Sequence, residues 1–351
     1  MGIQYPILQG PFGGNLSSAG LVAAVSGAGG LGGYGAYTLS PQEIVEVDRQ
    51  IKAATDKPYN MNLWISDADA PGRAVTDEQY ERAKQLFQPY FDEAGIPLPP
   101  RPAPFKPKFE DQVQAILDIR PKVFSFLFGA PSADILEQCR KRGILTAGAA
   151  TTPDEAIFLE AAGVDMIIAS GFEAGGHRPS FLATAESSTT GTFVLLQLIR
   201  EKVKLPVIAA GGIADGRGIA AALALGASAA QIGTAFLACD ESNASPVQRQ
   251  MLFSDAAKYT TLSRAFTGRL GRGLTSRIAQ ELAGHEKGIL PFPLQRIFMS
   301  SLQKAALDQQ KWELVLFWSG QVAPMLKHTR AKELMQSLIE GTNTYFNGLT
   351  A

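Results

Sequence analysis

Cysteine and net charge are both scarce in this sequence, and each shortage excludes a class of protein. The two cysteines, Cys139 and Cys239, lie far apart, without the paired spacing of a zinc site or the density of a disulfide framework. We therefore expect reduced thiols and no metal. With 32 Lys and Arg against 33 Asp and Glu, the formal net charge is −1, so neither nucleic acid nor an anionic membrane is an expected partner.

Long apolar runs are also missing. No stretch reaches the ~18 apolar residues of a membrane span, and residues 1–6 lack the basic segment and apolar core of a signal peptide. Hydrophobic residues make up 46% and charged residues 19% of the chain, values typical of a globular protein. We expect a cytoplasmic protein, a monomer or a homodimer, that acts on a small molecule.

Short strand-like segments alternate with helix-like segments through the first two thirds of the chain. Two helix starts are well marked, because Ser40-Pro41 and Thr152-Pro153 each combine a capping side chain with a proline in the first turn. Eight such strands in alternation predict an α/β fold, a parallel (β/α)8 TIM barrel. The strands are expected to start near residues 5, 30, 58, 122, 144, 165, 206 and 228.

Two segments fall outside this alternation. Residues 66–108 combine a helix-like stretch with a run of prolines, which suits neither a helix nor a central strand. They form an insertion after the third strand, either on the face where barrels build active sites or as a spacer without a binding role. Residues 241–351 are mainly helix-like. We therefore expect a barrel of residues 1–65 and 109–240, with 66–108 and 241–351 as a lid or substrate lobe.

The sixth strand carries the most informative motif. Residues 165–178 run from an apolar strand into a glycine-rich loop that ends in Gly175, Gly176 and His177. Glycine lets the backbone approach a flat ring or a phosphate closely, and histidine exchanges protons near neutral pH. The loop predicts one wall of an active site. A glycine-rich turn with a surface histidine is the alternative.

Two more glycine turns follow the seventh and eighth strands. They contain Gly211 and Gly212 after the seventh strand, and Gln231, Gly233 and Thr234 after the eighth. In many barrels these two loops hold a phosphate with backbone N–H groups. Together with the sixth loop they predict a mononucleotide phosphate site, although tight packing alone explains either turn singly.

In this order, these motifs resemble the nitronate monooxygenases, formerly called 2-nitropropane dioxygenases. Two later segments resemble elements of the same family: the basic, glycine-broken residues 263–273, and Leu-Phe-Trp-Ser-Gly-Gln at 316–321. Without the resemblance, the first segment could bind a carboxylate, cap the barrel or serve only in packing. The resemblance extends from Tyr5 to about Lys327 and covers nearly the whole chain.

The resemblance implies FMN as the cofactor, with its phosphate at the two later glycine turns and its ring over the barrel mouth. His177 matches the family's catalytic histidine. Ser170 stands where many family members have glutamine, so this contact is expected to differ. The implied cofactor-binding residues are Asn62, Ser170, Gly175, Gly176, Gly211, Gly212, Gln231, Gly233 and Thr234.

The implied activity is the FMN-dependent oxidation of alkyl nitronates, with nitroalkanes as further candidates, by molecular oxygen to carbonyl compounds and nitrite. His177 would take the α-proton of a nitroalkane, or bind an already deprotonated nitronate. The flanking Glu173 and Arg178 are expected to be solvated loop charges, with tuning of the histidine by either one as the alternative. Two alternatives stay open: an NAD(P)H-dependent FMN reductase of quinones or enoyl thioesters on the same barrel, and a flavin- or phosphate-binding module without turnover.

Overall fold

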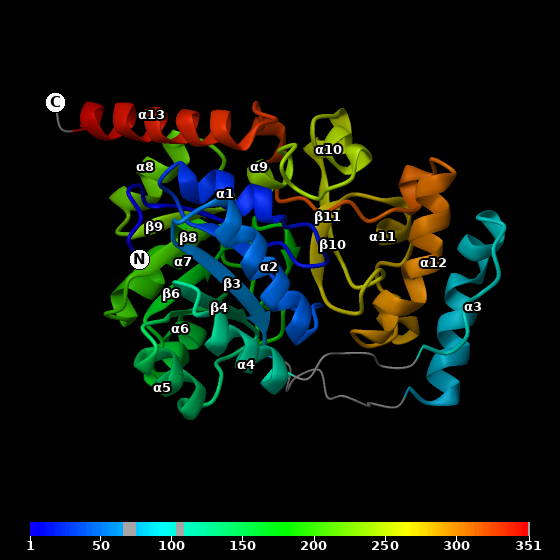
Figure 1. Cartoon of the computed structure of the whole chain (residues 1–351). Coiled ribbons are helices and arrows are strands. Elements are labelled where there is room, and N and C mark those ends of the chain that lie inside the picture. The colour runs from blue at the N-terminus through cyan, green and yellow to red at the C-terminus, as the bar shows by residue number, and fades with distance from the viewer. Residues whose placement is uncertain (66–74, 103–108, 350–351) are drawn as a thin grey trace.

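Eight parallel strands form a nearly closed barrel in the computed structural model, which describes residues 1–65, 75–102 and 109–349 (Figure 1). Their order around the barrel is β1-β9-β8-β6-β5-β4-β3-β2, and parallel bridges between Leu8 and Leu31 and between Phe12 and Tyr34 bring β1 against β2. The predicted TIM-barrel fold is confirmed. The strands are β1 Ile7–Gln9, β2 Gly32–Gly35, β3 Tyr59–Trp64, β4 Val123–Leu127, β5 Leu145–Ala150, β6 Met166–Ser170, β8 Val207–Ala210 and β9 Ala229–Ile232.

Helices surround these strands and begin where their capping residues predict. Ser40 forms a capping box with Glu43 at the start of α2, and the Thr152 side chain accepts a hydrogen bond from the Glu155 N–H at the start of α6. The apolar faces of the helices pack on the barrel, as with the fully buried Ile44 of α2. The helices are α1 Ala19–Gly27, α2 Pro41–Ala54, α4 Phe109–Ile119, α5 Ala133–Lys141, α6 Pro153–Ala162, α7 Thr192–Lys202, α8 Gly216–Ala224 and the short α9 Thr234–Leu237.

A smaller lobe lies beside the barrel and has its own hydrophobic core. It contains a three-stranded antiparallel sheet in the order β10-β11-β7. The strand β7 (Gly176–His177) comes from the loop after β6, so the barrel itself supplies one strand of the lobe. The other elements are α10 Pro246–Leu252, β10 Thr260–Ser263, β11 Gly271–Leu274, α11 Arg277–Glu281, α12 Leu294–Asp308, and one-turn 3₁₀ helices at Asp255–Lys258, Glu286–Gly288, Trp312–Leu314 and Ala323–Met325.

The insertion contributes the helix α3 (Asp77–Glu93), which packs against α12. The rings of Phe87 and Tyr80 lie 5.7 and 6.3 Å from the ring of Phe298. The prolines at 104 and 107 fall outside the described residues. In its described part, the insertion therefore completes the core of the lobe.

The last helix, α13 (Ala331–Leu349), lies across α8 and α1 on the barrel (Figure 1). A Cβ on Gly216 would overlap the backbone of Gly341, so glycine allows α8 and α13 to touch backbone to backbone. Within the described part of the chain, no helix has both the length and the apolar character needed to cross a membrane.

Candidate active site

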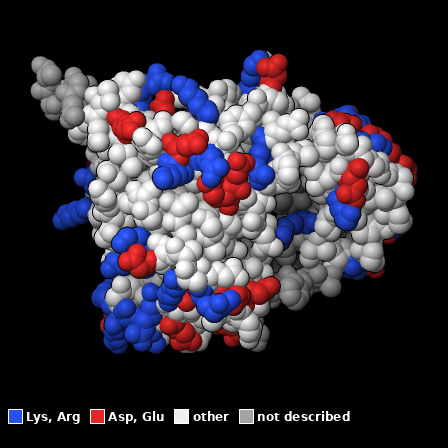
Figure 2. Space-filling model, turned by 45° about the horizontal axis from the view of Figure 1, so that its top comes forward, with Lys and Arg blue, Asp and Glu red and all other residues white. Residues whose placement is uncertain are grey.

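A cavity of about 930 Å³ opens where the carboxyl ends of the barrel strands face the lobe. Figure 2 shows a hollow between the two parts of the molecule, with Lys or Arg side chains at its mouth. None of the described insertion residues, 75–102, lines this cavity; α12 and residues 315–320 supply its outer wall. All ten predicted site residues do line it: Asn62, Ser170, Gly175, Gly176, His177, Gly211, Gly212, Gln231, Gly233 and Thr234.

The two later glycine turns lie on one side of the cavity and differ from each other. Gly211 and Gly212 have φ values of +108° and +69°, a region that L side chains rarely adopt. Gly233 has a φ of −100°, and a Cβ built there would have no neighbour within 4 Å in the described part of the chain. The first turn thus needs glycine for its backbone, whereas the second leaves open space that a ligand can fill.

Two buried acceptor atoms face no partner within the described residues. They are Oδ1 of Asn62 and Oε1 of Gln231, and both side chains line the cavity. The Nδ2 group of Asn62 donates to the Ser125 hydroxyl at 2.9 Å, which fixes the amide. Buried polar atoms of this kind are normally hydrogen-bonded. They match a ligand that brings N–H or O–H donors, as the ring and the ribityl chain of a flavin do.

His177 lies on β7 opposite Gly271 of β11. Its ring is enclosed by Trp64, Trp318 and Phe292, with ring centres 5.2, 5.0 and 6.0 Å away and steep interplanar angles. A Cβ on Gly271 would lie 2.8 Å from the Trp318 ring and 3.1 Å from Cδ2 of His177. Glycine at 271 therefore makes room for the histidine and the tryptophan together.

The surroundings of His177 keep its ring neutral. Burial, followed by the positive charges of Arg269 and Arg296, lowers the pKa of His177 from 6.5 to about 3. A ring with this pKa carries no charge at neutral pH. The same two arginines give the ring a positive electrostatic environment, which suits an anion.

The expectation of solvated charges beside His177 was wrong for Arg178, whereas Glu173 is half-buried and lines the cavity. Arg178 is only 2% exposed, and it donates to the carbonyl oxygens of Gly171 at 2.6 Å and Ser188 at 2.8 Å. The carboxylate of Glu173 accepts hydrogen bonds from the N–H and the hydroxyl of Thr192, both at 2.9 Å. Both charges hold the glycine loop in place.

Sequence reasoning missed a second buried cation. Arg272 of β11 is 3% exposed, donates to the carbonyl oxygen of Phe172 at 3.0 Å and lies 4.6 Å over the Phe172 ring. The alternating glycines and arginines of residues 263–273 gave no sign of which arginine is buried. The structure places Arg272 under the loop that carries His177.

The segment after α12 closes the site from the lobe. A Cβ on Gly175 would lie 2.5 Å from the Gly320 nitrogen, and the Gly320 N–H donates to the Thr234 hydroxyl at 2.9 Å. The side-chain amide of Gln248 bonds both the N–H and the carbonyl of Trp318, at 3.1 and 3.0 Å. The Trp-Ser-Gly-Gln motif was the only sequence signal for this contact.

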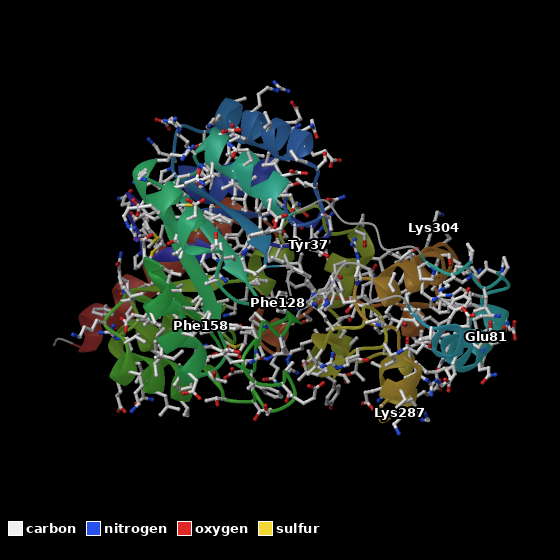
Figure 3. All side chains as sticks on the ribbon, turned by 90° about the horizontal axis from the view of Figure 1, so that it is seen from below. Tyr37, Glu81, Phe128, Phe158, Lys287 and Lys304 are labelled. Carbon is white, nitrogen blue, oxygen red and sulfur yellow. The ribbon has the colours of Figure 1, made fainter. Side chains whose placement is uncertain are left out.

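Further lining residues come from elements that the sequence analysis did not associate with the site. Tyr37 and Trp64 stack with ring centres 4.0 Å apart at the barrel mouth. Across the cavity, α12 contributes Arg296 and Lys304, and the Lys304 ammonium forms an ion pair with the Asp308 carboxylate at 2.5 Å. Figure 3 shows Tyr37 and Phe128 on the side of the barrel that faces the lobe, and Lys304 on α12.

The chain is similar in sequence and in structure to proteins that are already known. A family model described as nitronate monooxygenase matches residues 1–341. A nitronate monooxygenase from Pseudomonas aeruginosa is 40% identical over 345 residues, 97% of each chain, and one from Paraburkholderia phytofirmans is 38% identical over 96% of this chain and 92% of the relative. The solved nitroalkane oxidase from Streptomyces ansochromogenes superposes with a TM-score of 0.91 at 32% identity, covering 99% of this chain and 98% of the other.

Proposed function

The chain belongs to the nitronate monooxygenase family of oxidoreductases, and from this premise we propose that it binds FMN and oxidises alkyl nitronates with molecular oxygen to carbonyl compounds and nitrite. One observation carries the proposal. The two glycine turns, two unpartnered buried acceptors and His177 all meet in a single cavity. A convergence of polar groups in a deep, largely apolar pocket is typical of a cofactor and substrate site.

The lining residues fit FMN. The backbone of Gly211, Gly212 and Gly233 would receive the phosphate, since the open space at Gly233 leaves room for it. Asn62 and Gln231 would accept hydrogen bonds from the ring and the ribityl chain. When bound, FMN supplies the electron transfer between substrate and oxygen, which side chains alone do not provide.

Nitronates fit the electrostatics of the cavity better than nitroalkanes. A base with a pKa of about 3 holds a proton weakly, so removing the α-proton of a nitroalkane is slow. A nitronate arrives without that proton, and its negative charge is attracted by Arg269 and Arg296. The attraction of the nitronate anion, which was expected of His177, therefore comes from these arginines, because the neutral ring carries no charge.

The test is anaerobic mixing of the FMN-loaded protein with propionate 3-nitronate, NADH or NADPH. We expect rapid bleaching of the flavin by the nitronate and none by the pyridine nucleotides. The opposite result would establish the alternative, an NAD(P)H-dependent FMN reductase. A purified protein that takes up no FMN would refute the proposed cofactor.

A further inference from the structure

A buried hydroxyl touches the histidine of the site. Thr267 lies in the turn between β10 and β11, is 5% exposed and lines the cavity. Its Oγ1 is 2.8 Å from Nε2 of His177. The same oxygen is 3.1 Å from the carbonyl oxygen of Arg269 and accepts a hydrogen bond from the Arg269 N–H at 3.3 Å. Three contacts thus converge on one oxygen.

The donor in each of these contacts follows from the number of protons that the groups carry. A threonine hydroxyl has a single proton to donate, and a backbone carbonyl can only accept. Thr267 therefore donates to the carbonyl of Arg269. With the hydroxyl proton on this carbonyl, the donor in the contact with His177 is Nε2–H of the ring, which is the assignment that makes all three contacts of the oxygen hydrogen bonds. A neutral imidazole has only one N–H, so its lone pair lies on Nδ1.

Packing determines which edge of the ring is left for a substrate. Cδ2 of His177 lies against the position of Gly271, and Nε2 faces Thr267. The edge that remains carries Nδ1 and Cε1. Among the residues that the structure describes, Nδ1 has no hydrogen-bond partner, while His177 lines the cavity. This edge is the one available to a bound molecule.

We propose that Thr267 is a positioning residue that holds His177 in the Nε2–H tautomer, which makes Nδ1 the atom that accepts the α-proton of a nitroalkane. The proposal rests on the proposed function and extends it to neutral nitroalkanes. In this step the α C–H bond breaks and an N–H bond forms at Nδ1. The electron pair of the C–H bond stays on the substrate and is delocalised over the nitro group. The products are a nitronate and an imidazolium.

The charged groups that face His177 make this step slow rather than forbidden. Arg269, from the turn after Thr267, and Arg296, from α12, both oppose the imidazolium. The nitronate formed is the substrate of the proposed oxidation and needs no second proton transfer at this site. Loss of the Thr267 hydroxyl should therefore slow nitroalkane oxidation selectively.

The test compares Thr267→Val, which has nearly the same shape without the hydroxyl, with Thr267→Ser, which retains it. In the FMN-loaded protein we expect Thr267→Val to lower kcat for nitroethane roughly tenfold or more, since general bases contribute ~10²–10⁴-fold. The rate with ethyl nitronate should change less than about twofold, and serine should restore the nitroethane rate. Thr261→Val is the matched control, because the Thr261 hydroxyl bonds the Thr275 hydroxyl, at 2.8 Å, and neither residue lines the cavity.

Nitrogen-15 NMR gives a readout that does not depend on activity. The chain has three histidines, and His177→Asn identifies the signals of His177 by their disappearance. We expect a protonated Nε2 and an unprotonated Nδ1 in the wild type and in Thr267→Ser, and a mixture of tautomers in Thr267→Val.

Several results would overturn the proposal. One is a wild-type proton on Nδ1. Others are equal losses of nitroethane and nitronate oxidation in Thr267→Val, or a wild type that oxidises the nitronate but no nitroalkane. A holoprotein that oxidises neither substrate refutes the proposed function as well, while the NMR spectrum still decides the tautomer.

Discussion

Replacing Gly233 with alanine separates cofactor binding from folding. The backbone at this position has a negative φ of −100°, and a new Cβ would meet none of the described residues within 4 Å. The free energy of unfolding of the apoprotein should therefore change by less than about 0.5 kcal/mol. The methyl group projects into the space proposed for the FMN phosphate. Losing one hydrogen bond to a charged group costs ~1.5–3 kcal/mol, so the Kd for FMN should rise roughly 10- to 100-fold.

Urea unfolding of the apoprotein and fluorescence titration with FMN measure the two effects. Gly175→Ala is the matched control, because its Cβ would lie 2.5 Å from the Gly320 nitrogen and 2.6 Å from the Ser319 carbonyl carbon. This overlap should destabilise the apoprotein by ~1–3 kcal/mol. The reasoning fails if Gly233→Ala destabilises the apoprotein as much as the control does, or if it binds FMN as tightly as the wild type.

Two further predictions concern stability. The pKa of His177 is lower in the folded protein than in the unfolded chain. As the pH drops, the unfolded chain therefore binds this proton first, and the free energy of unfolding falls between about pH 6.5 and pH 3. From pH 7 to pH 5 the loss is about 2 kcal/mol. His177→Asn should remove that part of the pH dependence in urea unfolding, and an unchanged slope would contradict the shift. Arg178→Met keeps much of the side-chain volume but removes the hydrogen bonds to the carbonyls of Gly171 and Ser188. The free energy of unfolding should therefore fall by ~2–3 kcal/mol. A loss below about 0.5 kcal/mol would mean that Arg178 is solvated after all.

The barrel could be predicted from the sequence because its signals are local. Apolar runs, caps such as Ser40 and Thr152, and glycine stops each mark an element without reference to distant residues. The sheet of the lobe lacks such signals. β7 has two residues, and β11 is Gly-Arg-Gly-Leu, which has little intrinsic strand preference. These strands are defined by pairing with one another across the chain.

Some features of the site could also be predicted from the sequence, and others could not. Glycines at strand ends indicated where the cavity lies, because glycine marks positions where the backbone turns sharply or leaves open space. The burial of Arg178 was not visible, because it depends on the carbonyl of Ser188 in a segment that folds back over the arginine. The neutral state of His177 depends partly on Arg296, which reaches the site from α12. The burial of Arg178 and the neutral state of His177 could therefore be assigned only from the tertiary structure.

Burial and two neighbouring arginines keep His177 neutral, and on the proposed function the same arginines favour an anionic substrate. Arg269 and Arg296 disfavour a positive charge on the ring and, for the same reason, favour a negative charge beside it. A protonated histidine would duplicate a charge that the arginines already supply, whereas a neutral one keeps a lone pair for proton transfer. On the proposed function, the arginines attract the nitronate, and the histidine, held by Thr267, acts only on substrates that still carry their proton. The two substrates thus depend on different residues of the same cavity.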